Sequence, residues 1–280
     1  MPQTYPSKLL LFGEYAVLVG GEGFAIPYPK YSSAWRQADS PIDIIHDLRP
    51  FYKFLKTSEK FNAILDLEKF IEDLQNNYYL RSDIPIGMGL GSSGSVVAAV
   101  YDKYNNQAIK TEYASDLKTL KKELGEMENY FHETSSGLDP LVILLNKPIH
   151  LLHGGEPRAV TEEIHQLNDL NISLFNTGLE RKASTQIEIF INKMQSEDFS
   201  TLINEEYLPL VASVIEKLLE NDKEGFYLDL AALSAFQLQH FSFAIPDSVQ
   251  HQWQAGLQSG KEIYKLCGAG GGGYVLCFKN

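Results

Sequence analysis

The sequence is poor in cysteine and in positive charge. Two cysteines, Cys267 and Cys277, are too few for a disulfide framework in a chain of 280 residues, so we expect buried free thiols in a reducing compartment. The formal net charge of -12 argues against a protein that binds a nucleic-acid backbone through a basic surface. It does not exclude a small phosphate compound, which backbone N–H groups and one or two lysines can bind.

Long hydrophobic runs are also missing. No stretch reaches the roughly eighteen apolar residues of a membrane span. Residues 1–21 are apolar, but they lack an early basic region and are interrupted by Glu14, so they do not resemble a signal peptide. With 44% hydrophobic residues, the chain can build a core. We expect a soluble cytoplasmic protein, monomeric or homodimeric, without membrane or nucleic-acid partners.

Helices and strands are mixed in both halves of the chain, which predicts an α+β class with two lobes and a boundary near residue 157. Expected strands are strand–turn–strand over 8–21, then 141–146, 149–155, 171–178, and a strand–glycine turn–strand over 262–279. Expected helices cover the region beyond Pro50, 93–104, 115–132 with Ser115 as N-cap, 181–195, and two or three segments within 203–258.

The segment 85–95, PIGMGLGSSGS, runs directly into an apolar, helix-like stretch. Three of its glycines satisfy the G-x-G-x-x-G spacing of a dinucleotide-binding turn, but the preceding strand and the following acidic strand end are missing. The Walker A pattern fails as well, because no lysine follows the glycines. Small residues that enter a helix N-terminus offer free N–H groups and a positive dipole end, so the segment predicts a phosphate site.

Further clusters support this prediction. Lys8 begins a predicted strand in SKLLLFGEY, and Asp139 follows a small-residue turn in FHETSSGLDP. Taken singly, such a lysine is usually a surface residue and such an aspartate belongs to a turn. The segment 267–274, CGAGGGGY, has five glycines in six residues, whereas a hairpin needs one or two. We therefore expect another molecule or another glycine loop to approach its backbone closely.

Glu128 lies at the margin of the apolar stripe of the helix expected over 115–132. At about 100° per residue it is about 20° from Leu117 around the helix axis. A carboxylate there is either exposed or drawn inward to a cation. Periodicity alone favours the exposed position.

These segments resemble the three motifs of the GHMP kinases, the superfamily of galactokinase, homoserine kinase, mevalonate kinase and phosphomevalonate kinase. The middle motif of the superfamily is P-x-G-x-G-L-G-S-S-A-A, and this chain has Gly94 and Ser95 in place of the two alanines. KLLLFGEY matches the first motif and GAGGGG the last. Among the members, mevalonate kinase is most similar, because ENYFHETSSGLD resembles its segment from a metal-binding glutamate to a catalytic aspartate, and FNTGLERKAST resembles its T-G-x-x-R-x-T segment.

The resemblance implies a GHMP kinase fold. The N-terminal lobe, 1–157, would be similar to ribosomal protein S5 domain 2 and would bind ATP. The C-terminal lobe, 158–280, would be ferredoxin-like, and ATP would meet a small-molecule substrate between the lobes. The ATP phosphates would lie on a phosphate loop made of Gly87, Gly89, Leu90, Gly91, Ser92, Ser93, Gly94 and Ser95.

The resemblance also implies ATP-dependent phosphorylation of mevalonate at its C5 hydroxyl, a step of isoprenoid precursor synthesis. Asp139 would accept or orient the hydroxyl proton, and Lys8 would hold Asp139 and stabilise the transferring phosphoryl group. Ser93 and Glu128 would hold Mg²⁺, which places Glu128 inward, against the periodicity. Candidates near the substrate are Glu14, Tyr15, Thr177, Arg181, Gly270 and Gly271.

One departure leaves the substrate open. Typical mevalonate kinases have G-E-H where this chain has G-E-Y at 13–15, and G-E-Y is more usual in phosphomevalonate kinases. Phosphomevalonate kinase is therefore the first alternative, although only Arg181 and Lys182 offer extra positive charge for a second phosphate. A diphosphomevalonate decarboxylase is the next alternative. A catalytically inactive binding protein of the same fold belongs to a different class, but such relatives usually lose the lysine or the aspartate that this chain keeps.

Overall fold

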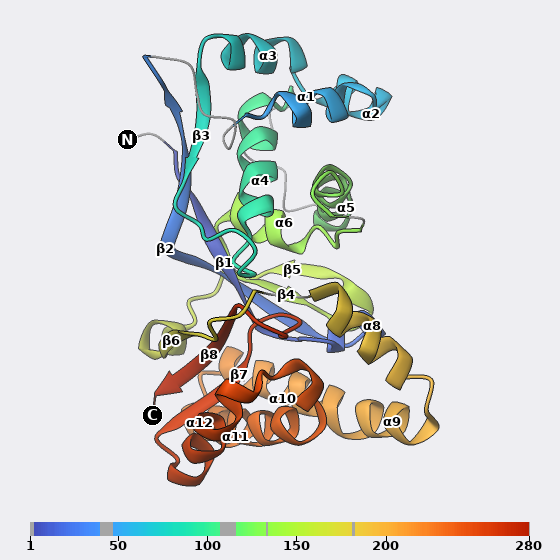
Figure 1. Ribbon diagram of the computed structural model, residues 1–280, viewed down its shortest axis with the longest axis vertical. Coiled ribbons are helices and arrows are strands. Elements are labelled where there is room, and N and C mark those ends of the chain that lie inside the picture. The colour runs from blue at the N-terminus through green and yellow to red at the C-terminus, as the bar shows by residue number, and fades with distance from the viewer. Residues whose placement is uncertain (1–2, 40–46, 107–115, 133, 181–182, 280) are drawn as a thin grey trace. The chain divides into compact units, whose positions relative to one another are not determined.

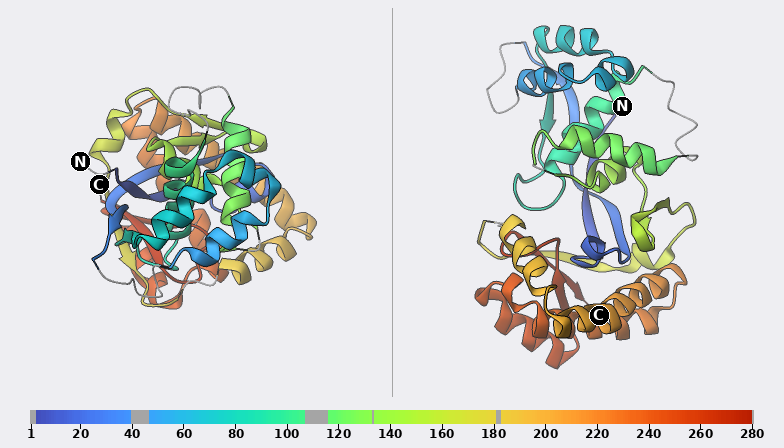
Figure 2. Two further views of the ribbon diagram at one scale, coloured as in Figure 1. Left: turned by 90° about the horizontal axis from the view of Figure 1, so that it is seen from above. Right: turned by 90° about the vertical axis from the view of Figure 1, so that its right-hand side faces the viewer.

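The computed structural model describes residues 3–39, 47–106, 116–132, 134–180 and 183–279. The chain forms two compact units that interleave along the sequence. The first unit contains Met1–Leu9, Ala25–Ile86 and Leu90–Ile149, and the second contains Leu10–Phe24, Gly87–Gly89 and His150–Asn280. Both units contain helices and strands, which confirms the predicted α+β class (Figures 1 and 2).

Five strands form one sheet in the order β1-β2-β4-β5, with β3 paired to β2. Their bounds are β1 (Tyr5–Phe12), β2 (Gly23–Gln37), β3 (Tyr78–Ser82), β4 (Ile149–Leu151) and β5 (Pro157–Ala159). β2 and β3 run antiparallel, with Trp35 opposite Leu80. β1, β2 and β4 each begin in one unit and end in the other.

The strand–turn–strand predicted over 8–21 is wrong in its second half. After β1 the chain forms a 3₁₀ helix, η1 (Ala16–Val19), and β2 begins only at Gly23. Tyr15 turns the chain with a φ of 63°, and the N–H of Val17 then bonds back to the carbonyl of Gly13. This local bonding replaces the bonds that a second strand would need.

Six helices of the first unit are described: α1 (Arg49–Lys56), α2 (Glu59–Ile64), α3 (Leu67–Gln75), α4 (Ser92–Tyr104), α5 (Leu117–Glu128) and α6 (Leu138–Leu145). α4 packs against α5 and α6 (Figure 1). The helix expected over 115–132 is shorter, because Asp116 is the N-cap that accepts from the N–H of Thr119. Ser115, the predicted N-cap, lies outside the described residues.

The strand predicted over 141–146 is wrong, because this segment belongs to α6. A short, continuous apolar run does not distinguish a buried strand from a buried helix. Gly137 begins α6 in the left-handed conformation, with a φ of 73°. Leu141, Val142 and Ile143 are all buried, because the helix packs against α4 and α5.

The second unit contains a three-stranded antiparallel sheet in the order β6-β8-β7, with helices packed on it. The strands are β6 (Asn171–Asn176), β7 (Glu262–Leu266) and β8 (Tyr274–Lys279), as predicted. The helices are α7 (His165–Asp169), α8 (Ala183–Lys193), α9 (Glu197–Leu202), α10 (Leu208–Leu219), α11 (Lys223–His240) and α12 (Asp247–Ser259), with short helical turns η4 (His153–Gly155), η5 (Ile203–Tyr207) and η6 (Ser242–Ala244). α11 and α12 pack against β7, and α10 packs against α11 (Figure 1).

Cys267 and Cys277 are buried free thiols, as expected. In the described part of the chain, no helix combines the length and the hydropathy that crossing a bilayer requires.

Candidate functional site

Lys8 and Asp139 form an ion pair in the first unit. The Lys8 Nζ lies 2.8 Å from the Asp139 Oδ1, and the lysine side chain is only 7% exposed. β1 supplies Lys8, and the first turn of α6 supplies Asp139. The backbone N–H of Lys8 also donates to the carbonyl of Leu90 at 3.0 Å. These contacts join β1, α6 and Leu90, which lies two residues before the start of α4.

Two glycines let α4 begin very close to this pair. A Cβ at Gly91 would lie 3.0 Å from the Lys8 Cγ, and Gly91 has a φ of 82°. A Cβ at Gly94 would lie 2.9 Å from the nitrogen of Pro140 and 3.0 Å from the Asp139 Cβ. The close approach of α4 to the first turn of α6 explains why glycine, rather than the usual alanine, stands at position 94.

Ser95 has a different explanation. Its hydroxyl is hydrogen-bonded to the hydroxyl of Ser33 on β2, and both side chains are buried. A buried hydroxyl requires a partner, so the two serines belong together. Both departures from the family motif therefore have a packing reason inside the first unit.

Glu128 is buried at the end of α5 and bound by hydroxyl groups. Ser93 donates to its Oε1 at 2.8 Å and Ser135 to its Oε2 at 2.5 Å, while the His132 Nε2 lies 3.1 Å from the Ser93 Oγ. The exposed position that periodicity favours is wrong, and the inward position is confirmed. Burial and the negative charge of Asp139 raise the pKa of the Glu128 carboxyl to about 7.

Ser93 and Glu128 fit a Mg²⁺ ion by their chemistry. Their donors are hard oxygen atoms, and two carboxylates, Glu128 and Asp139, interact closely enough to repel each other. Within the described ranges, no group of three His, Cys, Asp or Glu residues could hold a metal. Mg²⁺ does not require such a group, because it takes one or two protein carboxylates and otherwise keeps water and substrate oxygens.

The phosphate loop divides between the units, with Gly87 and Gly89 in the second and Leu90 to Ser95 in the first. Gly87 and Gly89 have φ values of 75° and 80°, which favour glycine. α4 begins at Ser92, so its first turn provides N–H groups without helical acceptors, and the positive end of the helix dipole. This geometry suits an anion.

Glu14 and Tyr15, predicted near the substrate, are buried in the second unit. The Lys265 Nζ lies 2.5 Å from the Glu14 Oε1, and neither side chain is exposed. Burial raises the pKa of the Glu14 carboxyl, and the Lys265 ammonium acts in the opposite direction. The Tyr15 hydroxyl donates to the carbonyl of Ala269. Within the second unit, Glu14 thus pairs with β7, and Tyr15 binds the last glycine loop, Gly268–Gly273.

Other segments of the second unit approach the last glycine loop, Gly268–Gly273, closely. A Cβ at Gly270 would lie 2.4 Å from the carbonyl oxygen of Ala244, and one at Gly272 would lie 2.3 Å from that of Glu180. A Cβ at Gly271 would lie 2.7 Å from the Cγ of Gln186. The number of glycines therefore follows from close internal packing.

Thr177 is the other predicted substrate residue that the structure describes. Its N–H and its hydroxyl both donate to the carbonyl of Gly273 at 2.9 Å. Thr177 therefore binds the last glycine loop in the second unit. Arg181 lies outside the described residues.

Sequence reasoning missed Lys265, His132 and Ser135 as partners of the predicted residues. Lys265 interrupts an apolar strand, EIYKL, and such a lysine inside a buried strand is a signal that a carboxylate lies nearby. His132 follows Glu128 by one helical turn, although the helix itself ends at Glu128. No sequence signal pairs Ser135 with Glu128 across the turn between them.

Residues 54–147 match the family model described as the GHMP kinases N terminal domain. No curated protein sequence matches the chain. The mevalonate kinase of Methanococcus jannaschii is similar in structure, with a TM-score of 0.66 and 19% identity over 100% of this chain and 90% of that one. A phosphomevalonate kinase of Streptococcus pneumoniae, in complex with phosphomevalonate and AMPPNP, has a TM-score of 0.66 and 19% identity over 100% and 92%.

A galactokinase of Lactococcus lactis complexed with galactose has a TM-score of 0.62 and 16% identity over 99% of this chain and 84% of that one. At such identities the structural likeness shows the fold alone, and it does not separate mevalonate kinases from phosphomevalonate kinases. The matched N-terminal domain contains the phosphate loop, Glu128 and Asp139. Residues 54–147 therefore match the N-terminal domain of the GHMP kinases, and the whole chain shares the fold of these solved kinases.

Proposed function

We propose that this protein is an ATP-dependent kinase that phosphorylates a small alcohol, with mevalonate at its C5 hydroxyl as the first choice. The observation that carries the proposal is the Lys8–Asp139 ion pair. It lies where α4 begins, and the N-terminus of α4 suits the phosphates of ATP. A base, a cation and an anion site thus occur together in the first unit.

The proposed role of Asp139 is to accept the proton of the substrate hydroxyl as its oxygen attacks the γ-phosphorus. The Lys8 ammonium fixes the orientation of the Asp139 carboxylate, and it offsets negative charge on the transferring phosphoryl group. Phosphoryl transfer depends mainly on positioning and on charge stabilisation. The close approach of Gly91 to Lys8 on β1 and of Gly94 to the first turn of α6 supports such positioning.

Ser93 and Glu128 would hold Mg²⁺, which supplies charge neutralisation for the ATP phosphates when it is bound. Glu128 must be ionised for this role. The Ser135 hydroxyl fixes one carboxylate oxygen of Glu128, so the other oxygen and the Ser93 hydroxyl remain directed toward each other. His132, beside Ser93, orients the serine hydroxyl.

The second candidate is a phosphomevalonate kinase. The structural likeness to the Streptococcus pneumoniae enzyme equals the likeness to a mevalonate kinase. The G-E-Y motif carries less weight, because the Tyr15 hydroxyl is bonded to Ala269 and its ring stacks on Phe190 with centroids 4.7 Å apart. A packed tyrosine is a reason for G-E-Y that does not involve the substrate.

A coupled ADP-release assay with mevalonate, phosphomevalonate, galactose and homoserine tests the proposal. We expect Mg²⁺-dependent turnover with mevalonate, at a kcat/KM at least about tenfold above the other three acceptors. A preference for phosphomevalonate would select the second candidate instead. ADP release with none of the four would favour the inactive binding protein.

A further inference from the structure

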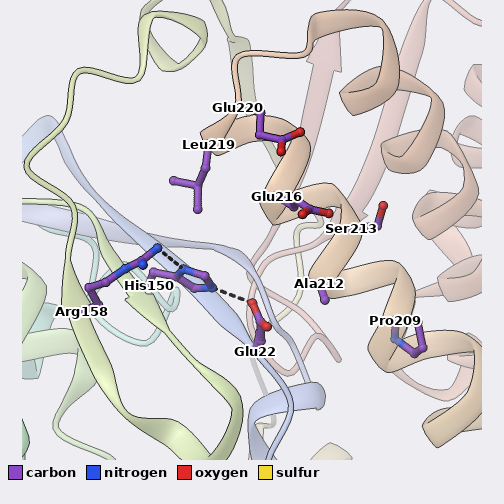
Figure 3. Close-up of a pocket in the computed structure, with 9 residues that line it drawn as sticks. All are labelled: Glu22, His150, Arg158, Pro209, Ala212, Ser213, Glu216, Leu219 and Glu220. Carbon is purple, nitrogen blue, oxygen red and sulfur yellow. Dashed lines mark hydrogen bonds and ion pairs between the residues drawn. The ribbon is translucent and has the colours of Figure 1, made fainter.

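The second unit contains a pocket with a volume of about 520 Å³. No residue that lines it belongs to the proposed reaction. Glu22, His150 and Arg158 form one wall, and one face of α10, from Pro209 to Glu220, forms the other (Figure 3). The volume lies within the range of small-molecule sites in proteins.

Hydrogen bonds fix the first wall. Arg158 Nη2 lies 3.3 Å from His150 Nδ1, and His150 Nε2 lies 2.6 Å from Glu22 Oε2. A guanidinium can only donate, so Nδ1 accepts, and the ring proton is on Nε2, from which it is donated to Glu22. His150 is buried, and the three side chains form the row that Figure 3 shows.

The opposite wall follows from the two faces of α10. Val211, Val214, Ile215 and Leu218 are buried in the unit. The residues that line the pocket recur on the other side of the helix, where Pro209, Ala212 and Leu219 offer apolar surface beside the carboxylates of Glu216 and Glu220. Methylene groups of a ligand can pack on the apolar residues while polar ends reach the charges.

The charged side chains of the pocket differ in whether an oppositely charged or hydrogen-bonding partner lies beside them. Glu220 has the Lys217 ammonium at 3.4 Å, and Glu22 has the N–H of His150. Among the described residues, no salt bridge within 4.0 Å involves Glu216 or Arg158, although the Arg158 guanidinium bonds to His150 and interacts with the charge of Glu162. The Glu216 carboxylate and the remaining donors of the Arg158 guanidinium therefore belong to opposite walls of the same pocket (Figure 3).

We propose that this pocket binds a small zwitterion, in which a short aliphatic chain joins an ammonium group to a carboxylate. The ammonium binds Glu216, the carboxylate binds the remaining donors of Arg158, and the chain lies on Ala212 and Leu219. A metal ion does not suit the pocket, because the Arg158 guanidinium on its wall would repel a cation. A polyamine does not suit it either, because Arg158 would repel a second ammonium.

Saturation-transfer NMR titrations on the full chain test the proposal. The probes are glycine, 4-aminobutanoate and 6-aminohexanoate, which vary the distance between the charges, with butylamine and butanoate carrying one charge each. We expect at least one zwitterion to bind saturably, about tenfold or more tighter than both single-charge probes, because each charged contact adds affinity.

Variants then locate the binding. Glu216→Gln and Arg158→Gln should each weaken the preferred zwitterion about tenfold, while Glu188→Gln, an exposed change on α8, should leave its Kd unchanged. The proposal would be overturned if none of the zwitterions binds saturably, or if butylamine binds as tightly as the preferred zwitterion. Binding of the zwitterion that is unchanged in both pocket variants would also overturn it. The binding readout does not depend on kinase activity, so it fails or succeeds independently of the proposed function.

Discussion

Glu128 shows how a single residue can oppose stability for the sake of a site. Its carboxyl is buried beside Asp139, and both effects raise its pKa to about 7. In the unfolded chain the same group titrates near the ordinary glutamate value. The native state therefore holds a proton that the unfolded state loses between these two values, so stability falls as the pH rises through this window.

Without Mg²⁺, the variant Glu128→Gln should be more stable than the wild type at pH 8, by roughly 1–3 kcal/mol. At pH 5 the difference should be much smaller, because native Glu128 is then largely protonated. Urea unfolding at both pH values measures this, and Glu126→Gln, at a surface ion pair on the same helix, should show no such dependence. A variant no more stable than the wild type at pH 8 would contradict this view of Glu128.

Lys265 and Glu14 depend on each other at the same scale. Both are fully buried, and removing one partner of a buried pair leaves the other uncompensated. Lys265→Met should cost about 3–5 kcal/mol of unfolding free energy, and adding Glu14→Gln should recover most of that loss. Equal losses in the single and the double variant, measured by chemical unfolding, would show that the pair is not coupled.

At the scale of elements, the close contact between α4 and α6 sets the position of Asp139. Gly94 lies against the backbone of Pro140, so any added side-chain atom must displace the first turn of α6. This turn carries Asp139, and small displacements of a reacting group reduce the rate strongly.

Gly94→Ala should therefore lower kcat about tenfold to hundredfold, with a smaller change in the KM for the alcohol. Val96→Ala is the matched control on α4, because it removes atoms from the core rather than adding them beside Asp139, and its kcat should stay near the wild-type value. Steady-state kinetics on both variants decide the matter: an unchanged kcat in Gly94→Ala would remove this role from the α4–α6 contact.

The long helices and strands could be predicted from the sequence, as could the residues proposed for the site in the first unit. The short apolar segments could not. α4 and the β7–β8 hairpin follow from helical periodicity and from a glycine turn. Residues 141–145 and 16–19 are short apolar runs. Such a run is compatible with a buried helix and with a buried strand, so only tertiary packing decides between the two. Lys8, Ser93, Glu128 and Asp139 were found through motifs, whereas the Glu14–Lys265 pair joins residues 251 positions apart and leaves no local pattern.

For the whole molecule, the interleaving of the two units is the feature that a linear reading misses. Residues 10–24 belong to the second unit, although they precede most of the first. Phe12 packs on Phe226 and Phe278 there, and Glu14 and Tyr15 hold β7 and the last glycine loop. The first motif thus supplies Lys8 to one unit and core residues to the other.

The most direct test asks whether Asp139 takes part in the proposed phosphoryl transfer. It measures kcat of Asp139→Ala by ADP release with mevalonate and Mg·ATP. Asp198→Ala, an exposed change on α9, serves as the control, and circular dichroism checks that both variants fold. We predict that Asp139→Ala loses at least about a hundredfold in kcat, while Asp198→Ala keeps the wild-type value. Retention of more than about a tenth of kcat in Asp139→Ala would contradict the role of Asp139 as the base.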